Sequence, residues 1–396
     1  MEQTQISQTI LYIIIILLFA KVLGELAERI GQPPVLGELI AGVILGGSVL
    51  GWIEPNGAIL FLAELGAILL LFEVGLESDI EEFLRVGPSA FMVATIGVIG
   101  PFTVGYIVSL ALGLSNTVAI FIGATLTATS VGITARTFSE LGQLRTAEAK
   151  IVLGAAVIDD VMGLVILAVV SGLVKNGCVS AWDIGKTTIL AIAFLVGAIM
   201  IGIRVAPYLM TIIKKLRTRG VLTITAFLFC LLLAYGANQL HLAAIVGAFA
   251  AGLVLAKTED IAHIEARIKP LADVFIPIFF VQLGLMVNLS VLNPFNQQSR
   301  ENLLIMVVLV LVAIVMKILS GLGVLRRKVN RLIVGVGMIP RGEVGLIFAS
   351  IGFAHKIITP GEYSAIIAIV VITTFVTPPL LKLLLKIEQK TAVPTE

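Results

Sequence analysis

Long apolar segments recur along nearly the whole chain, and short connections that contain Gly, Pro or charged residues separate them. A helix needs about 20 predominantly apolar residues to cross the hydrocarbon core of a bilayer. By this measure we expect an all-α polytopic membrane protein with thirteen transmembrane helices. The expected ranges are 8–30, 34–50, 57–76, 87–112, 116–138, 148–174, 185–213, 220–238, 242–257, 270–288, 302–324, 331–354 and 362–387.

Composition narrows the class of protein. Of the 396 residues, 58% are hydrophobic and only 13% are charged, which excludes an ordinary soluble domain. The sequence contains no basic patch with interleaved aromatic residues, so we expect no nucleic-acid partner. Cys178 and Cys230 stand far apart without motif spacing, and neither a disulfide framework nor a metal site follows from them. We expect no cofactor and no enzymatic activity.

The distribution of Lys and Arg predicts how the helices are oriented. With the amino terminus outside, the inner connections and the carboxyl tail hold nineteen of these residues and the outer connections hold four. Cytoplasmic connections of membrane proteins carry the excess of positive charge. We therefore expect an outer amino terminus and a cytoplasmic carboxyl terminus, in a prokaryotic-type plasma membrane or an energised internal membrane. The remaining four basic residues lie inside spans, at Lys21, Arg204, Lys317 and Arg341.

The two halves of the chain resemble each other. Four segments of the first half match segments of the second half in the same order, at offsets that drift from 209 to 214 residues. The matches pair VLGELIAGVILG (35–46) with IVGAFAAGLVLA (245–256), LFEVGL (71–76) with FVQLGL (280–285), SVGI (130–133) with EVGL (343–346), and VIDDV (157–161) with VITTF (371–375).

These matches pair the second expected span with the ninth, and the sixth with the thirteenth. A displacement by seven spans reverses the direction across the membrane, so the halves are predicted to be inverted repeats of six helices each. The repeats are 8–174 and 220–387, and the helix 185–213 links them. Inverted repeats with binding sites near the midplane are typical of secondary transporters.

Asp159 and Asp160 lie in the middle of the sixth span, in the run GAAVIDDVMGLVILAVV. One charged side chain at the centre of a bilayer costs about 2.5–3.5 kcal/mol on insertion scales, so buried charges in a span usually have a function. At 1.5 Å per residue, Asp160 lies roughly 18 Å from the inner end of its helix and Lys317 roughly 12 Å from the inner end of its own. These depths are compatible with contact. We predict a proton- or cation-binding site here, with Lys317 as the counter-charge.

Two further spans carry helix-breaking residues at mid-depth. Thr129 and Ser130 lie in a run of hydroxyl side chains in the fifth span, and Pro340, Arg341 and Glu343 lie in the twelfth. Gly132 lies in the fifth span, and Pro340 and Gly342 lie in the twelfth. Proline removes a helix hydrogen bond and glycine weakens helix continuity, so both spans are predicted to be interrupted helices whose freed carbonyls can help to hold a cation. Arg341 and Glu343 would compensate charge at the break. The hydroxyls of Thr129 and Ser130 are candidate ion ligands, although ordinary close helix packing explains them equally well.

These motifs together closely resemble one transporter family. IDD (158–160), ATSVGIT (128–134), PRGEVGLIFA (340–349), LFEVGLESD (71–79) and the distant Lys317 are similar to the monovalent cation:proton antiporter-2 family. The resemblance covers essentially the whole chain. It implies the NapA/NhaA-like sodium–proton antiporter fold, with crossed broken helices and a homodimer in the lipid bilayer.

The resemblance also implies roles for individual residues. Asp160 would be the main carboxylate for the transported Na⁺ and for the proton, and Asp159 would pair with Lys317 when the cation is absent. The presence of both Asp residues implies exchange of sodium (or lithium) for protons with net charge movement. It further implies a mobile core domain and a dimerisation domain. The core domain comprises 87–174 and 302–387, and the dimerisation domain comprises 8–76 and 220–288.

Three alternatives compete with this interpretation. A potassium–proton antiporter on the same fold remains open, because the sequence does not separate K⁺ from Na⁺. The inverted repeats and the opposite charges of the Asp pair and Lys317 at the midplane are typical of a carrier and disfavour a channel. An intramembrane aspartyl protease needs two Asp residues on different helices, whereas Asp159 and Asp160 are adjacent.

Overall fold

The computed structural model describes residues 2–392 except 79, 177–180, 214–219, 241, 287–296, 326–327, 343–344, 346–347, 350–351 and 354–355. The described part of the chain consists of helices and connections and has no β-strand. In chain order the helices are α1 (Glu2–Arg29), α2 (Pro34–Leu45), α3 (Gly57–Leu76), α4 (Ile80–Ala111), α5 (Asn116–Thr127), α6 (Val131–Glu140), α7 (Ala147–Asn176), α8 (Ala181–Ile213), α9 (Val221–Gln239), α10 (Ala244–Leu255), α11 (Ile261–Leu285), α12 (Gln297–Ser320), η2 (Gly321–Gly323), α13 (Arg331–Gly337) and α15 (Pro360–Ala392).

Many of these helices are suited to a bilayer. Within the described residues, nine helical segments are long and apolar enough to cross a membrane, and α2 and α10 are shorter apolar helices. Large apolar side chains on the outside of α1, such as Ile10, Ile14 and Leu18, are more than half exposed. An apolar surface of this kind is solvated poorly by water and well by lipid chains. The chain is an all-helical membrane protein, and the exact number of thirteen spans stays a prediction.

Several expected boundaries were wrong. Helices α1, α4 and α12 begin at Glu2, Ile80 and Gln297, earlier than the expected residues 8, 87 and 302. Helix α2 ends at Leu45 instead of residue 50, because Gly46 has an extended backbone with φ −73° and ψ 177°. Helix α11 begins at Ile261 instead of residue 270, and it continues through Pro270. Proline inside a transmembrane helix is tolerated when neighbouring groups satisfy the freed backbone, so Pro270 does not mark the start of this helix.

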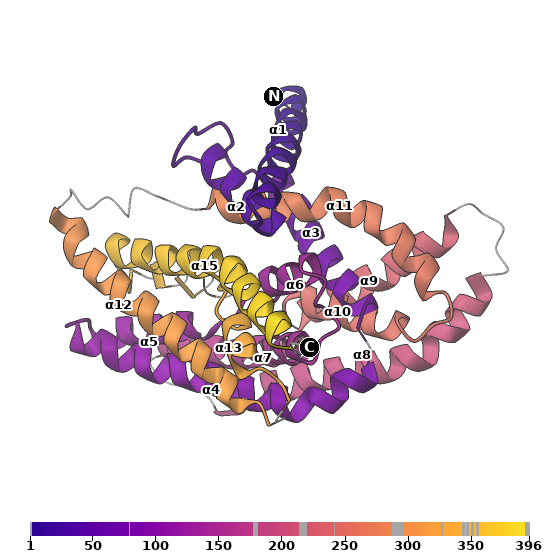
Figure 1. Cartoon of the computed structure of the whole chain (residues 1–396). Helices are drawn as coiled ribbons and strands as arrows, with labels where there is room; N and C mark the ends of the chain where they lie inside the picture. Colours follow the sequence, from indigo (N-terminus) through magenta and orange to yellow (C-terminus); the bar gives the residue numbers. More distant parts are fainter. Residues whose placement is uncertain are drawn as a thin grey trace.

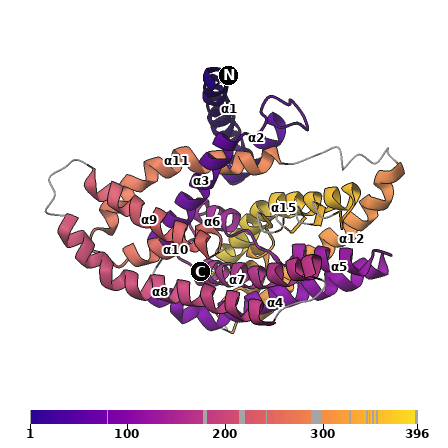
Figure 2. The same ribbon diagram turned by 180° about the vertical axis from the view of Figure 1, so that it is seen from behind.

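The helices pack in two groups, which Figures 1 and 2 show from opposite sides. In one group α4 packs against α5, α7 and α12, and α12 packs against α15. In the other group α3 packs against α10 and α11, α2 packs against α1 and α11, and α9 packs against α10. Helix α6 touches α7 and α15 of the first group and α2 and α3 of the second, so it lies at their boundary.

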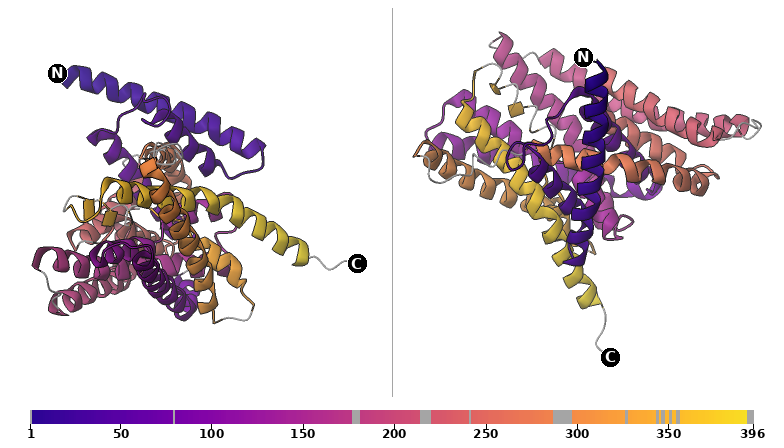
Figure 3. Two further views of the ribbon diagram at one scale, coloured as in Figure 1. Left: turned by 90° about the vertical axis from the view of Figure 1, so that its left-hand side faces the viewer. Right: turned by 90° about the horizontal axis from the view of Figure 1, so that it is seen from above.

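A second junction between the groups lies near the end of α1. The ammonium group of Lys382 on α15 donates to the carbonyl oxygen of Gly31, which follows α1. In the view from above in Figure 3 the carboxyl-terminal half of α15 passes the end of α1, where this contact lies.

Glycines allow the closest helix contacts in the second group. A Cβ atom on Gly42 of α2 would lie 2.1 Å from the carbonyl oxygen of Val281 and 2.6 Å from Cα of Gly284 on α11. A Cβ atom on Gly252 of α10 would lie 2.4 Å from the carbonyl oxygen of Phe72 and 2.7 Å from Cα of Gly75 on α3. Both pairs of helices therefore meet backbone to backbone, as small residues permit in membranes.

We predict that Gly42→Ala destabilises the protein while Gly47→Ala does not. The first substitution forces a methyl group into the α11 backbone, and overpacking of this kind typically costs about 1–3 kcal/mol. A Cβ atom on Gly47 would meet nothing within 4 Å. Thermal unfolding of the purified protein in detergent should show a melting temperature lower by about 5 °C for the first variant only. Equal melting temperatures for both variants would contradict the close contact.

Candidate functional site

The two adjacent carboxylates lie at the centre of α7. The side chain of Asp159 is 1% exposed and that of Asp160 is 7% exposed. The first turn of α7 is anchored to the start of α13, because Glu148 Oε1 accepts a hydrogen bond from the backbone N–H of Asn330 at 2.9 Å. Consecutive residues of a helix point about 100° apart. The two carboxylates therefore face different neighbours.

Lys317 of α12 is the cation next to Asp159. Its side chain is fully buried, and its Nζ lies 3.3 Å from Asp159 Oδ2 in an ion pair. The same ammonium group donates to Thr129 Oγ1 at 2.7 Å. Asp160 is near enough to act electrostatically on Lys317. The structure thus brings together four of the residues predicted from the sequence, from α7, α12 and the segment between α5 and α6.

Thr129 and Ser130 lie where the fifth predicted span is interrupted. Helix α5 ends at Thr127 and α6 begins at Val131, and the residues between them are extended. Helix α13 ends at Gly337, and residues 338–342 are not helical. The two interruptions touch, because the backbone N–H of Ser130 donates to the carbonyl oxygen of Pro340 at 2.7 Å. The predicted interruption of the span 116–138 is confirmed, and the helix that begins the span 331–354 ends at Gly337, while part of the remainder of that span lies outside the described residues.

Arg341 compensates charge at this crossing. It is fully buried, and its guanidinium donates to the carbonyl oxygens of Leu126 at 2.6 Å, Ile339 at 2.8 Å and Ala313 at 3.4 Å. Leu126 lies in the last turn of α5, where unpaired carbonyls carry the negative end of the helix dipole. The predicted partner Glu343 lies outside the described residues, as does Cys178.

The second half holds hydroxyl groups where the first half holds carboxylates. Thr373 and Thr374, which match the Asp pair in sequence, are buried on α15. The hydroxyl of Thr374 donates to the carbonyl oxygen of Arg341 at 2.8 Å. A small enclosed cavity of about 30 Å³ lies beside Thr374 and Arg341, between α15 and residues of α2 and α11. This space is large enough for a water molecule.

Two features of the site region were not expected from the sequence. Gly97 of α4 faces Lys317, since a Cβ atom built on it would lie 3.5 Å from Nζ. Arg136 of α6 forms ion pairs with Glu140 at 2.6 Å and with buried Glu38 of α2 at 3.8 Å. Glu140 also accepts a hydrogen bond from the backbone N–H of Val35 at 3.2 Å. Charged contacts thus join α6 to α2 across the boundary of the two groups.

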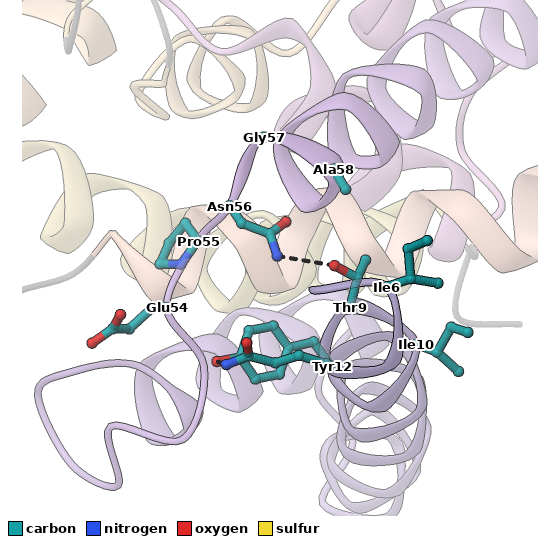
Figure 4. Close-up of a pocket in the computed structure, with 10 residues that line it drawn as sticks. Ile6, Thr9, Ile10, Tyr12, Glu54, Pro55, Asn56, Gly57 and Ala58 are labelled. Atoms are coloured by element: carbon teal, nitrogen blue, oxygen red, sulfur yellow. Dashed lines mark hydrogen bonds between the residues drawn. The ribbon is translucent and has the colours of Figure 1, made fainter. Parts of the chain in front are cut away.

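A larger open cavity lies elsewhere, between the amino-terminal half of α1 and the segment before α3. It has a volume of about 660 Å³, and Figure 4 shows its lining residues. Asn56 donates to Thr9 Oγ1 at 3.2 Å across it, and Glu54 stands at its edge. None of the residues predicted for the site lines this cavity, and the crossing of the interrupted helices remains the stronger candidate.

Comparison with known proteins agrees with this geometry. Residues 14–387 match the transmembrane domain of the sodium/hydrogen exchanger family. The chain is 40% identical to the high-affinity Na⁺/H⁺ antiporter NhaS3 of Synechocystis sp., over 98% of this chain and 92% of that protein. It is 35% identical to the Na⁺/H⁺-K⁺ antiporter GerN of Bacillus cereus, over 93% of this chain and 94% of that protein.

A solved structure shares the fold. The sodium proton antiporter MjNhaP1 from Methanocaldococcus jannaschii is 21% identical, with a TM-score of 0.66 over 97% of this chain and 96% of that one. The family match over residues 14–387 and the 40% identity to NhaS3 establish the family of this chain. This chain belongs to the sodium/hydrogen exchanger family.

Proposed function

We propose that this protein is a secondary active antiporter that exchanges sodium (or lithium) for protons by alternating access. The observation that carries the proposal is the buried ion pair of Lys317 with Asp159, next to Asp160 and at the crossing of two interrupted helices. Relatives that cover nearly the whole chain are named Na⁺/H⁺ antiporters. A buried charge pair is otherwise a poor source of stability, so a role in binding explains it better.

Charge balance accounts for the coupling of the two ions. The described site holds two carboxylates, Asp159 and Asp160, and two cations, Lys317 and Arg341. Their formal charges sum to zero when both carboxylates are ionised and to +1 when Asp160 carries a proton. A sodium ion would add one positive charge in a region of low dielectric. Such a charge is costly unless another one leaves. Protons on Asp160 and Lys317 are the charges that can leave, so sodium and protons compete for the site.

The liganding oxygens follow from this scheme. Asp160 is the main sodium ligand in the proposal. Asp159 becomes a second ligand when Lys317 loses its proton and no longer pairs with it. Ser130 at the crossing adds a hydroxyl oxygen. Departure of protons from both Asp160 and Lys317 for each sodium ion would move net charge, so we propose electrogenic exchange. The same Asp pair supports assignment to the monovalent cation:proton antiporter-2 group within the family.

The glycine contacts support an inverted repeat. Gly42 corresponds in sequence to Gly252, and Gly284 corresponds to Gly75. Gly42 of the first half touches Gly284 of the second, and Gly252 of the second half touches Gly75 of the first. Such reciprocal contacts are what a pseudo-two-fold axis in the membrane plane would produce.

The packing groups support a moving core. We propose that α4, α5, α6, α7, α12, α13 and α15 move together against the remaining helices. Helices α1, α2, α3, α9, α10 and α11 form the dimerisation domain in the proposal, and α8 links the two repeats. The amino terminus lies outside and the carboxyl terminus lies in the cytoplasm. The sparse charged contacts of α6 with α2 would then have to rearrange during transport.

Potassium–proton exchange is the second candidate. The observation in its favour is the name of GerN, an Na⁺/H⁺-K⁺ antiporter that is 35% identical to this chain. Proton flux in proteoliposomes, measured with sodium, lithium and potassium at a clamped membrane voltage, separates the two. Flux driven by sodium and lithium but not by potassium supports the first proposal, and flux driven by potassium alone supports the second.

The variant Asp160→Asn should abolish sodium-driven proton exchange, because the amide can neither bind a proton nor balance a cation. The measurement is quenching of a pH-sensitive dye in proteoliposomes after addition of NaCl. Asp273→Asn on α11 is the matched control, because it makes the same chemical change at an exposed position and should retain exchange. Retained exchange in the Asp160 variant would rule out this residue as the ion site.

The variant Lys317→Gln should shift the pH profile of exchange or abolish charge movement. Without the ammonium group Asp159 has lost the cation that competes with sodium for it, so the acidic limb of the profile should move to lower pH. Currents from proteoliposomes on a solid-supported membrane, recorded between pH 5 and 9, test this. Lys186→Gln on the exposed surface of α8 is the control. A profile and a current like those of the wild type would mean that Lys317 is only structural.

A further inference from the structure

Helix α6 connects the candidate ion site to a cluster of charged side chains. It begins directly after Ser130 and ends at Glu140. Near its end Arg136 pairs with Glu140 at 2.6 Å and with Glu38 of α2 at 3.8 Å. Glu140 also accepts a hydrogen bond from the backbone N–H of Val35 at 3.2 Å. The helix has 10 residues and is therefore roughly 15 Å long, so the ion site and the charged contacts are the two ends of one short element.

The charged contacts cross the boundary between the two groups of helices. Helix α6 belongs to the moving group in the proposal, whereas α2 and α3 belong to the other group. The side chains of Glu38 and Glu140 are 3% and 8% exposed, so water screens their attraction to Arg136 only weakly. Glu73 of α3 is near enough to attract Arg136 as well. Separation of α6 from α2 would leave buried carboxylates without their cation, which is strongly unfavourable.

The opposite face of the membrane has no such charges at the corresponding positions. In an inverted repeat, the counterparts of Arg136, Glu38 and Glu140 lie toward the other face. At the offsets of 210 and 213 residues that relate the two halves, these counterparts are apolar, namely Ala248, Ala349 and Phe353. The repeat therefore predicts a similar contact of helices on the other face, but one without an ion pair.

Two further polar contacts between the groups lie on the same face in the proposed orientation. Lys257, which follows α10, pairs with Glu81 of α4 at 3.0 Å, and Lys382 of α15 donates to the carbonyl oxygen of Gly31. The side chain of Glu81 is 81% exposed, and exposed ion pairs contribute little to stability. The buried contacts of Arg136 are therefore the stronger charged link.

We infer that Arg136, Glu38 and Glu140 form a one-sided latch, which holds α6 against α2 and favours the described conformation over the one in which this face opens. The inference rests on the proposed function and adds a resting state to it. A contact that forms in only one of two conformations shifts their equilibrium toward that conformation. In the proposed orientation the latch closes the cytoplasmic face, so the ion site at rest is turned toward the outside.

A buried residue between the groups can report the opening. Leu70 of α3 is 2% exposed, and a Cβ atom built on Gly132 of α6 would lie 3.5 Å from its Cδ2. In a Leu70→Cys, Cys178→Ser parent, a water-soluble maleimide should label position 70 only when α6 moves away from α3. The native Cys230 is buried on α9 and stays in place, so its labelling reports unfolding of the protein.

The experiment compares labelling rates of latch variants of this parent in detergent. We expect Arg136→Gln to accelerate labelling at position 70 about tenfold, which corresponds to a latched state weakened by about 1.4 kcal/mol. Glu38→Gln should accelerate it less, because Arg136 keeps Glu140, and the double variant should be no faster than Arg136→Gln. Arg29→Gln is the matched control, since it removes an exposed Arg–Glu pair within α1 that joins no groups. It should leave the rate unchanged, and Cys230 should stay protected throughout.

Four results would overturn the inference. They are an unchanged rate in Arg136→Gln, an equal acceleration in Arg29→Gln, accelerations by Arg136→Gln and Glu38→Gln that multiply in the double variant, and parallel labelling of Cys230. If Arg136→Gln does not give a monodisperse protein, the comparison of Glu38→Gln with the parent decides, and an unchanged rate there overturns the latch.

The labelling experiment involves no transport, so it separates the latch from the proposed function. Unchanged labelling in Arg136→Gln, together with loss of exchange in Asp160→Asn, would overturn the latch and leave the antiporter proposal intact. Accelerated labelling in a protein whose wild type exchanges no sodium for protons would support the latch and contradict the antiporter proposal.

Discussion

The ammonium group of Lys317 and the carboxylate of Asp159 form a buried ion pair, with exposed fractions of 0% and 1%. The attraction between two buried charges repays the loss of their hydration only when further hydrogen bonds satisfy them. The hydroxyl of Thr129 supplies one such bond to Lys317. The remaining oxygen of Asp159 has no hydrogen-bond partner among the described residues.

The interrupted helices make this arrangement possible. Continuous helices would keep their carbonyls bonded internally, whereas α5 and α13 end at Thr127 and Gly337 inside the helix bundle and leave their last carbonyls without helix partners. Arg341 neutralises the carbonyls of Leu126 and Ile339, and thereby places a second cation beside the acidic pair. Glycines such as Gly97 keep side chains away from the ammonium group. Charge compensation at the crossing therefore involves α5, α12 and the segment after α13.

The sequence predicts the elements of the site because their signals are local. Charged residues in an apolar run, such as Asp159 and Lys317, are costly wherever the chain goes, and Pro340 has no backbone N–H for a helix hydrogen bond. Their pairing was inferred from depth and from the resemblance. In contrast, the link of Arg136 to Glu38 joins residues about a hundred positions apart, and the direction of the Thr129 hydroxyl depends on an acceptor from α13. Such contacts follow from packing and leave no pattern in a single sequence.

The central claim is that a sodium ion enters this site only when protons leave it. The most direct measurement is proton release by the purified protein in weakly buffered detergent solution, followed with a pH indicator as NaCl is added near neutral pH. The account predicts that binding of each sodium ion releases at least one proton, and that the release disappears in Asp160→Asn. Saturable sodium binding to the wild-type protein without any release of protons would contradict it.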